Sequence, residues 1–359
     1  MATRGLHDAA LATRISFSRG FETWLRVHQL SLAFTSYRTG TLFLVGAHPE
    51  GSIWVDRQAF DQAMGLCWRT GRLYLGTRHQ LWRLDNRLRP GELGDRLFDQ
   101  VLVARNAQTI GDVGIRELGV DAHGRVVFVS SRYSCLCRHH PTHSFEPLWK
   151  PGFISGIAAE DRCRLNGLAT LDGSPRYATA LGASDRGWRD LPQPSGILVD
   201  VTSDAVIADG LALPHSPRLS GGCLYLLESG RGRILRIDPA NGERHFVAAC
   251  PGFLRGLAIH AGYAVVTISR PRLDDPRGAE IAEALRMRGE EPWCGVLIVN
   301  LATGETVEWI ALDGAITELF DVAVLPGVRC PMAIGPESAR IHDTISFEPI
   351  PRQAVGAGV

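Results

Sequence analysis

The segment Pro214-His215-Ser216-Pro217-Arg218 places a histidine and a serine between two prolines. Each proline ring fixes its own φ, so this stretch presents its side chains rigidly. A rigidly held imidazole is suited to general-base catalysis or to binding a ligand. The same stretch would also serve as a stiff linker whose histidine bonds a backbone carbonyl. We predict that His215 takes part in catalysis.

Polar side chains also stand just before several short apolar runs. Asn166 precedes Gly167-Leu168-Ala169, Arg255 precedes Gly256-Leu257-Ala258, and Asp112 lies shortly before Ile115. If the runs are strands around one axis, these polar groups converge on a shared pocket. We therefore predict that Asn166 and Asp112 act with His215 in catalysis. The predicted substrate-binding residues are Arg116, Arg164, Arg218, Arg255, Trp188, Glu318 and Asp321.

Each of these residues also has a purely structural interpretation. Asn and Asp side chains commonly bond nearby backbone groups in turns. Arg218 and Arg255 could brace the edges of neighbouring sheets without touching a ligand. Trp188 could fill a gap between sheets instead of stacking on a ligand at a loop tip.

Cys135-Leu136-Cys137 offers metal ligands, with His139, His140 and His143 close behind. Structural zinc sites usually space their cysteines by two to four residues and add a second pair elsewhere. A strand end followed by a polar loop is therefore our interpretation of this stretch. We predict no bound metal or other cofactor, with a divalent cation in the central channel as the alternative.

A hydrolytic triad is a further possibility for His215. Ser216 or Ser229 would supply the nucleophile and Asp185 the carboxylate. No Gly-x-Ser-x-Gly motif surrounds either serine, and Glu228-Ser229-Gly230 equally suits a tight turn. The triad is therefore the weaker alternative for this histidine.

The elements that would position these residues form a loose repeat. Each copy has a short apolar run, a turn with Gly, Asp or Pro, and a second apolar run, as in residues 118–129 and 255–266. Repeats of about 40–50 residues built from short strands indicate a β-propeller. Counting the copies predicts an all-β fold with about seven blades. Six is the alternative, if the first copy supplies only outer strands to the last blade.

The propeller should span residues 31–349 as one domain. Phe21, Trp24 and Leu25 form a short apolar stripe, which predicts a helical arm over residues 1–30. A helix is also expected over 279–291, where Ile281 and Leu285 share one face. Residues 350–359 are expected to form a frayed tail.

Composition limits the classes of partner. The chain of 359 residues carries no formal net charge and has no basic block, which argues against nucleic acid. No apolar run approaches the ~20 residues needed to cross a bilayer. Most of the eight cysteines stand singly in strand-like runs, which is typical of a reduced, cytoplasmic protein. We predict a small-molecule or peptide substrate, and neither a nucleic acid nor a membrane as partner.

Several of these motifs together resemble an uncharacterised bacterial family with a domain of unknown function, over about residues 20–335. The likeness implies a propeller-like protein, often found beside biosynthetic genes, and no particular activity. The motifs that carry it are Asp161–Ala169, Gly187–Arg189, Pro214–Arg218, Pro251–Ala258 and Leu325–Arg329.

The chain departs from that family in two stretches, which lack two histidines and one Asp of the family. The family's third unit reads Gly-Asp-Leu-Asp-Ile-His-Asp, where residues 111–117 here read Gly-Asp-Val-Gly-Ile-Arg-Glu. Its fourth unit reads Cys-His-Leu-Asn-Gly, where residues 163–167 read Cys-Arg-Leu-Asn-Gly. Arg116 and Arg164 thus replace histidines, and arginine at these points would repel a cation and favour an anion.

The Asn-Gly-Leu-Ala stretch at 166–169 is also similar to the gluconolactonase and senescence-marker type of six-bladed propeller. There an asparagine at this point helps to hold a divalent cation in the channel. The likeness is short and bears on Asn166 alone.

The first functional hypothesis is therefore a propeller enzyme of a bacterial biosynthetic pathway. It would act in the central channel on a polar or carboxylate-bearing small molecule or peptide, by hydrolysis, lactone opening, cyclisation or isomerisation. The alternatives are a non-catalytic propeller that binds a peptide or partner protein, and a metal-dependent, lactonase-like hydrolase.

Overall fold

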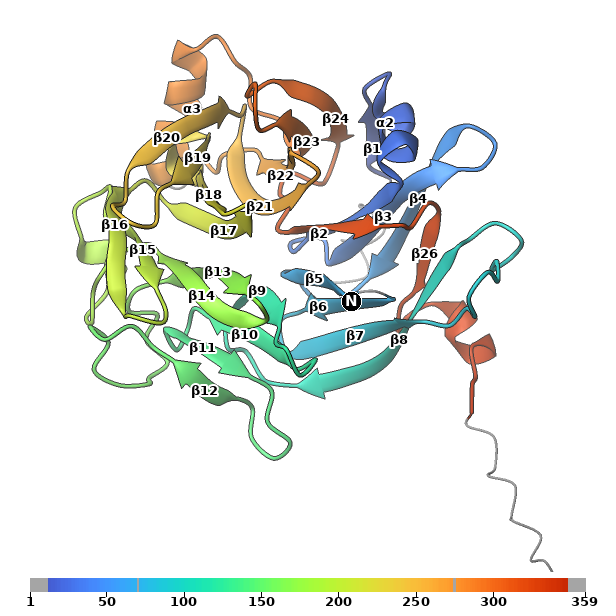
Figure 1. Ribbon diagram of the computed structural model, residues 1–359, viewed down its shortest axis with the longest axis horizontal. Coiled ribbons are helices and arrows are strands. Elements are labelled where there is room, and N and C mark those ends of the chain that lie inside the picture. Colours follow the sequence, from blue (N-terminus) through green and yellow to red (C-terminus); the bar gives the residue numbers. More distant parts are fainter. Residues whose placement is uncertain (1–11, 70, 274–275, 348–359) are drawn as a thin grey trace, which may run out of the picture.

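Six β-sheets surround a central axis in the computed structural model, which describes residues 12–69, 71–273 and 276–347 (Figure 1). Neighbouring strands are antiparallel, except that β26 runs parallel to β8. Each sheet is given from the axis outward. The first has β25 (Val322–Pro326), β2 (Leu30–Ser36), β3 (Thr41–His48) and β4 (Ser52–Ala59), and the second has β5 (Leu66–Arg69), β6 (Arg72–Gly76), β7 (Gln80–Asn86), β8 (Gln100–Thr109) and β26 (Pro331–Ile334). The third has β9 (Ile115–Val120), β10 (Val126–Ser130), β11 (Cys135–Arg138) and β12 (Glu146–Trp149).

The other three sheets complete the ring. The fourth has β13 (Leu165–Leu171), β14 (Ser174–Ala180), β15 (Gly196–Asp200) and β16 (Ala205–Leu211). The fifth has β17 (Pro214–Ser220), β18 (Cys223–Glu228), β19 (Arg233–Ile237) and β20 (Arg244–Ala249). The sixth has β21 (Phe253–His260), β22 (Tyr263–Ser269), β23 (Cys294–Asn300), β24 (Thr306–Asp313) and β1 (Arg14–Phe17). The all-β propeller predicted from the repeat is confirmed. We name each blade by its innermost strand.

The blade count of seven was wrong, and the stated alternative of six is what the structure has. The first and last repeat copies belong to one blade: β25, from the end of the chain, pairs with β2 and becomes its innermost strand. The two copies were counted separately because nothing in the sequence of either one reveals this long-range pairing. The chain ends reinforce two other blades, where β1 pairs with β24 and β26 with β8.

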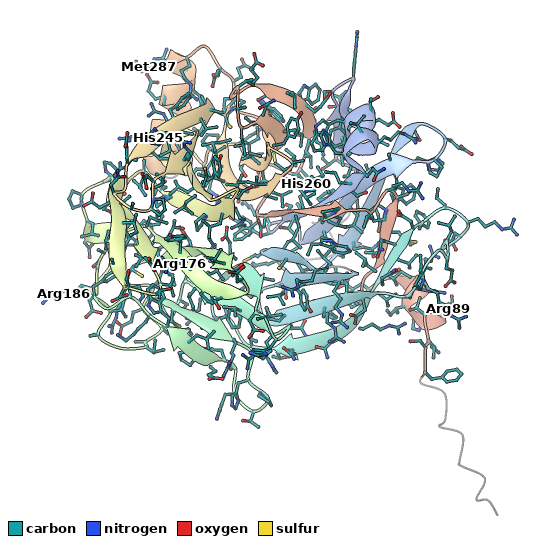
Figure 2. The ribbon with its side chains drawn as sticks, in the orientation of Figure 1. Arg89, Arg176, Arg186, His245, His260 and Met287 are labelled. Carbon is teal, nitrogen blue, oxygen red and sulfur yellow. The ribbon has the colours of Figure 1, made fainter. Side chains whose placement is uncertain are left out.

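Several middle strands of the blades are continuous apolar runs because neighbouring blades cover both faces of the sheet there. In β23, Val296, Leu297, Ile298 and Val299 are all buried. Side chains consequently fill the space between the ribbons, while Arg89, Arg186 and Met287 lie at the periphery (Figure 2). This two-sided packing explains why apolar runs, and not alternation, marked the strands in the sequence.

An Asp or Asn ends the third strand of several blades and shapes the turn that follows. Asp200, Asp238 and Asn300 each accept a hydrogen bond from the backbone N–H two residues on, at 2.8 to 2.9 Å. Such side-chain turns reverse the chain without a longer loop. They account for the regular Asp and Asn signal in the repeat.

The glycine that recurs in the inner strands has a packing role. A Cβ on Gly167 would lie 2.5 Å from the ring of Pro217, and one on Gly256 would lie 2.6 Å from the Cα of Asp321. Neighbouring inner strands can therefore approach the axis closely only where this side chain is missing.

The predicted N-terminal arm is helical only in part. Helix α2 covers Phe21–His28 and buries Phe21, Trp24 and Leu25, as the stripe predicted. The segment before it forms strand β1 instead, because it pairs with the outer edge of β24. Residues 1–11 and the predicted tail at 350–359 lie outside the described residues.

The predicted insertion helix is α3, which spans Pro276–Met287 and buries Ile281 and Leu285. It starts three residues earlier and stops four residues sooner than expected. A left-handed backbone at Gly289, with φ of 70°, follows its end. Across the described part of the chain, no helix is long and apolar enough to span a membrane.

Candidate active site

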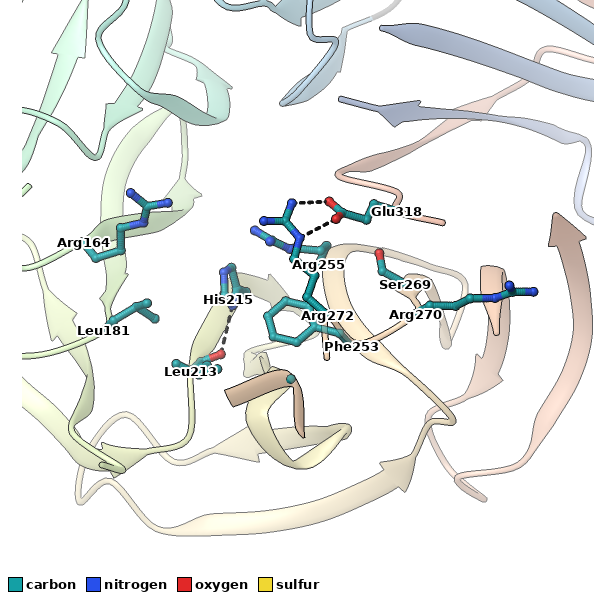
Figure 3. A pocket seen from close by; sticks show the side chains of 11 residues that line it. Arg164, Leu181, Leu213, His215, Phe253, Arg255, Ser269, Arg270, Arg272 and Glu318 are labelled. Carbon is teal, nitrogen blue, oxygen red and sulfur yellow. Dashed lines mark hydrogen bonds and ion pairs between the residues drawn. The ribbon is translucent and has the colours of Figure 1, made fainter. Parts of the chain in front are cut away.

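A pocket of about 130 Å³ opens where the inner strands begin, at one end of the central channel (Figure 3). Helix α3 contributes to its wall through Gly278. The lining residues are Arg164, Leu181, Leu213, His215, Phe253, Arg255, Ser269, Arg270, Arg272, Gly278 and Glu318. Four are arginines and one is a carboxylate, so the pocket is strongly positive.

His215 has a defined tautomer. Its Nδ1 lies 2.9 Å from the carbonyl oxygen of Leu213 and 3.0 Å from the hydroxyl of Ser229. Because a carbonyl oxygen only accepts hydrogen bonds, Nδ1 must carry the proton. Nε2 therefore keeps its lone pair and is the nitrogen that can accept a proton. In Figure 3 the ring lies between Arg164 and Arg255.

The surroundings keep this imidazole neutral. Burial lowers the pKa of His215 well below its ordinary value. The positive charges of Arg255, Arg116 and Arg164 lower it further, while the bond to Leu213 partly offsets them. A neutral imidazole can accept a proton, although the lowered pKa makes it a weaker base until a bound anion offsets the arginine charges.

Arg116 and Arg255 are brought together by an aromatic ring. The guanidinium carbons lie 5.8 and 5.7 Å from the ring centroid of Phe320. Arg255 also lies 4.8 Å from the ring centroid of Phe253. Stacking on aromatic faces fixes the two guanidinium groups without neutralising them.

Burial and the neighbouring arginines both disfavour the charged form of Arg116. Burial lowers the pKa of Arg116, and the charges of Arg164 and Arg255 lower it further, against a weaker opposing effect of Asp161 and Asp112. A guanidinium does not lose its proton in proteins, so the lowered pKa reflects first the cost of burying this charge and then the repulsion from the two other arginines. An anion bound here would relieve it.

Strained backbone accompanies these side chains. Arg164, Leu213 and Ser216 adopt left-handed conformations, with φ of 54°, 52° and 50°. Residues with a Cβ avoid this region, and such strain persists where surrounding contacts enforce it, often at functional sites. Here it directs the Leu213 carbonyl to the imidazole.

Glu318 occupies the other wall of the pocket. Its carboxylate, which is nearly inaccessible to solvent, accepts a bidentate bond from Arg272 that includes a 2.7 Å contact with Nη2. Arg38 approaches the same group at 3.5 Å. Glu318 therefore compensates Arg272, while Asp161 pairs with Arg164 at 2.7 Å on the other side of the pocket.

Deeper in the channel, a buried network joins three alternate blades. Arg218 on β17 donates to Glu117 on β9 at 2.9 Å and lies 3.8 Å from Asp321, which directly precedes β25. Glu117 also accepts from Leu168 N at 2.7 Å and from the Ser216 hydroxyl. These contacts tie opposite sides of the ring together.

Asp321 is unusual within this network. It accepts backbone hydrogen bonds from Leu66 and Val322, both at 2.8 Å. Burial nevertheless raises its pKa to about 7, with Arg218 opposing and Glu117 adding to the rise. Beyond the network the channel opens into a second cavity of about 440 Å³, where the inner strands end and which Arg218 also lines.

Comparison with known proteins places the chain in a family. A family model described as a domain of unknown function, DUF4915, matches residues 19–334. The chain belongs to this family. No curated protein matches its sequence.

Solved structures resemble the DUF4915 chain in fold alone. A chain of a nidogen/laminin complex has a TM-score of 0.54 at 13% identity, with 84% of this chain and 100% of that chain covered. Virginiamycin B lyase from Staphylococcus aureus has a TM-score of 0.41 at 12% identity, with 66% and 73% covered. The first similarity is consistent with the six-bladed propeller.

The DUF4915 structure brings together four of the predicted site residues. Arg164, His215, Arg255 and Glu318 line the pocket, and Arg116 joins them through Phe320. Arg218 lies instead in the buried network, because it is further along β17 than His215. Asp321 also lies there, because it accepts hydrogen bonds from inner-strand backbone.

Two predicted catalytic residues lie outside the pocket. The Asn166 amide donates to Pro214 O at 3.0 Å and accepts from Thr179 at 2.7 Å, so both of its ends hold strands together. The Asp112 side chain is on an exposed turn and accepts from Gly114 N at 3.4 Å. We assign both residues structural roles.

Trp188 does not line the pocket but packs behind residues that do. It is buried against Leu181, Leu213 and Phe253, so the gap-filling alternative describes it. Its indole N–H lies 3.5 Å from Asp161, which pairs with Arg164 at 2.7 Å. Trp188 thus contacts Asp161, the carboxylate that pairs with Arg164.

The metal and triad alternatives gain no support from the geometry. Among the described residues, no three His, Cys, Asp or Glu side chains are grouped to hold a metal ion. Cys135 and Cys137 are fully buried in a strand, with sulfurs 3.3 Å apart. Ser229 contacts His215 but is also fully buried, so no substrate can reach it as a nucleophile.

Sequence reasoning missed several residues of the DUF4915 pocket. Ser269 is the last residue of β22, and Arg270 and Arg272 follow it, where the insertion interrupts the repeat. The interruption itself was the available signal, since inserted loops often carry functional groups. Phe253 and Leu181 resemble ordinary core residues in sequence and gave no signal.

Proposed function

We propose that this DUF4915 protein is an enzyme that binds a carboxylate-bearing small molecule in the arginine-rich pocket and removes a proton from it. The observation that carries the proposal is a neutral His215, with Nε2 unprotonated, set among Arg116, Arg164 and Arg255. A base beside fixed positive charges is the arrangement that proton abstraction next to a carboxylate requires.

Each group would have a distinct task. Arg164 and Arg255 would hold the substrate carboxylate, since a guanidinium matches its two oxygens. His215 Nε2 would accept the proton, and Leu213 O would stabilise the imidazolium through Nδ1–H. The negative charge that develops on the substrate would be stabilised by the same arginines.

This chemistry favours reactions that begin with loss of a proton, such as isomerisation or cyclisation, over hydrolysis. Hydrolysis by a covalent route needs an accessible nucleophile, and Ser229 is buried. A metal-assisted route needs a cation next to three arginines, which their charge opposes.

The test is hydrogen exchange in D₂O. Pyruvate and 2-oxoglutarate serve as probes, with exchange of the carbon-bound hydrogen next to the carbonyl followed by proton NMR. We expect exchange above the uncatalysed rate, and a loss of about 10²-fold or more in His215→Gln. His245→Gln, a substitution of a half-exposed histidine on β20, is the matched control and should retain the full rate.

Two results would overturn the proposal. Equal exchange in His215→Gln and the unsubstituted protein would remove the histidine from catalysis. Binding of the probes without any exchange would mean a non-catalytic, anion-binding propeller instead.

A further inference from the structure

The second cavity, of about 440 Å³, lies at the end of the channel opposite the His215 pocket. Among the described residues, the two cavities share no lining residue. All six inner strands contribute to the wall of the second cavity near their ends, and the residues that line it are mostly apolar. One apolar residue from each strand is Trp68, Val120, Leu168, Leu219, Ile259 and Val324. Closure of the propeller thus builds an apolar ring here.

Several of these apolar side chains are not fully covered by the protein. The half-buried ones are Trp68, Leu219, Ile259 and Val324. Covering such surface with an apolar ligand is favourable, because it removes the surface from water. The cavity volume also lies within the range of about 300–1,000 Å³ that is typical of small-molecule sites, which combine apolar walls with few polar groups. Size and wall therefore both suit a small apolar ligand.

Arg218 supplies a hydrogen-bond donor at the inner end of this cavity. Its Nη1 donates to Glu117, Leu168 O and Pro217 O. Its Nη2 donates to Glu117 at 3.3 Å. No acceptor in the described part of the chain takes up the Nε–H of Arg218. A hydroxyl or carbonyl oxygen of a ligand can accept this remaining hydrogen bond.

The charges around the cavity favour an uncharged ligand. At the inner end, Arg218 lies 2.9 Å from Glu117 and 3.8 Å from Asp321, so one cation already faces two carboxyl groups. A ligand carboxylate there would add a further negative charge where solvent screens charges weakly. At the other end of the wall, exposed Arg69 ends β5 and would repel a ligand ammonium group.

We propose that this cavity is a second ligand site, for an uncharged small molecule with an apolar body and a hydroxyl or carbonyl oxygen at one end. The oxygen would accept a hydrogen bond from Arg218, and the apolar body would lie against Trp68, Ile259 and Val324. This inference goes beyond the proposed function and does not rest on it, because no residue of the His215 pocket takes part.

The experiment compares probes with the same alkyl chain by calorimetric titration of the full chain: 1-octanol, octanoate and octylamine. At about pH 8 and an ionic strength of about 0.15 M, octanoate is an anion and octylamine a cation. We expect 1-octanol to bind about tenfold or more tightly than either charged probe. The shorter 1-butanol should bind about tenfold or more weakly than 1-octanol, because it covers less of the apolar wall.

A cavity-filling variant assigns the binding to this end of the channel. Val324→Trp places a larger side chain in the cavity and should weaken binding of 1-octanol about tenfold or more. Val307→Trp, at a 40% exposed position on β24, is the matched control and should leave the affinity unchanged.

Protection of a thiol gives a second measurement, in the unsubstituted protein. Cys67 lines the cavity and is half-buried, whereas the half-buried Cys223 on β18 lies outside it. With 1-octanol at about ten times its Kd, occupancy should slow alkylation of Cys67 by iodoacetamide about tenfold. Alkylation of Cys223, followed by mass spectrometry of the same digest, should be unchanged.

Three results would overturn the inference. The first is absence of 1-octanol binding. The second is binding of octanoate or octylamine as tight as that of 1-octanol, which would make the ligand charged. The third is 1-octanol binding that leaves Cys67 unprotected, which would place the ligand elsewhere. Because the thiol measurement needs no substitution, it decides the matter even if Val324→Trp fails to fold.

Discussion

Arg116 and Arg255 lie on opposite parts of the propeller ring, yet their guanidinium carbons are 5.8 and 5.7 Å from the centroid of the same phenyl ring, that of Phe320. Closure of the ring of blades brings these two like charges to one phenyl ring. This closure therefore places Arg116 and Arg255, which are far apart in the sequence, beside the same pocket. His215, which lies among these charges, is thereby kept neutral and able to accept a proton.

The first prediction concerns Phe320→Leu. Loss of the ring removes two cation–π contacts of about 0.5–1 kcal/mol each, while Arg255 keeps its contact with Phe253. We expect anion affinity to fall about threefold to tenfold, measured by titration with malonate. Phe34→Leu, in a core cluster away from the pocket, is the control. It should lower the melting temperature without changing anion affinity; an equal loss of affinity there would contradict the role of Phe320.

The second prediction is the pH dependence that His215 contributes to stability. Its pKa is lower in the folded protein than in the unfolded chain, so the unfolded chain binds the extra proton first. Its contribution to stability is therefore lost as the pH falls below the ordinary histidine value of about 6.5. We expect urea unfolding of His215→Gln to show a weaker loss of stability between about pH 7 and pH 5. An unchanged slope would mean that the imidazole is not held neutral.

The third prediction concerns Asp321, whose pKa is raised to about 7. A carboxyl with a raised folded-state pKa contributes stability while it is protonated and loses it as the pH rises through that value. The loss accumulates between the ordinary carboxyl value of about 4 and the raised value of about 7, so we expect Asp321→Asn to gain stability, measured as melting temperature, relative to the unsubstituted protein as the pH rises across this range. Parallel curves for the two proteins between about pH 4 and pH 7 would show that the pKa of Asp321 is not raised in the folded protein.

The fourth prediction tests the buried ion network. Arg218→Met leaves Glu117 and Asp321 without their shared cation, which should cost about 3–5 kcal/mol in the free energy of unfolding. The double variant Glu117→Gln with Arg218→Met should be more stable than Arg218→Met alone. Arg186→Met, exposed at the periphery, is the control and should be nearly neutral. A loss below about 1 kcal/mol in Arg218→Met would show that the network does not brace the ring.

The fifth prediction concerns metal. Arginine at 116 and 164 surrounds the pocket with positive charge, so a divalent cation should not bind there. We expect EDTA to leave the melting temperature and the exchange activity unchanged. Stoichiometric, tightly held metal in the purified protein, detected by elemental analysis, would contradict this.

The fold was predictable because its signals are local. Apolar runs, and turns closed by residues such as Asp238 and Asn300, recur at similar spacing and identify blades without knowledge of their contacts. The blade count depends on β25 joining β2 across nearly the whole chain, and no local pattern encodes that pairing. Ring closure is therefore where sequence reasoning failed.

The site was predictable in part for a related reason. His215, Arg164 and Arg255 were found because they stand where inner strands begin, and closure converges such positions. Asn166 stands at an equivalent point, but Thr179 and Pro214 O occupy its amide, and sequence does not show which partners a side chain will meet. Arg272 was missed because it lies beyond a strand end, in a segment that the repeat does not describe.

The central claim is that Arg164 and Arg255 bind an anion beside His215. A crystal structure at saturating malonate tests it most directly. We predict malonate with carboxylate oxygens within about 3 Å of guanidinium nitrogens of both arginines, and next to His215 Nε2. Water alone in this pocket at saturation, or malonate found only in the cavity at the other end of the channel, would contradict it.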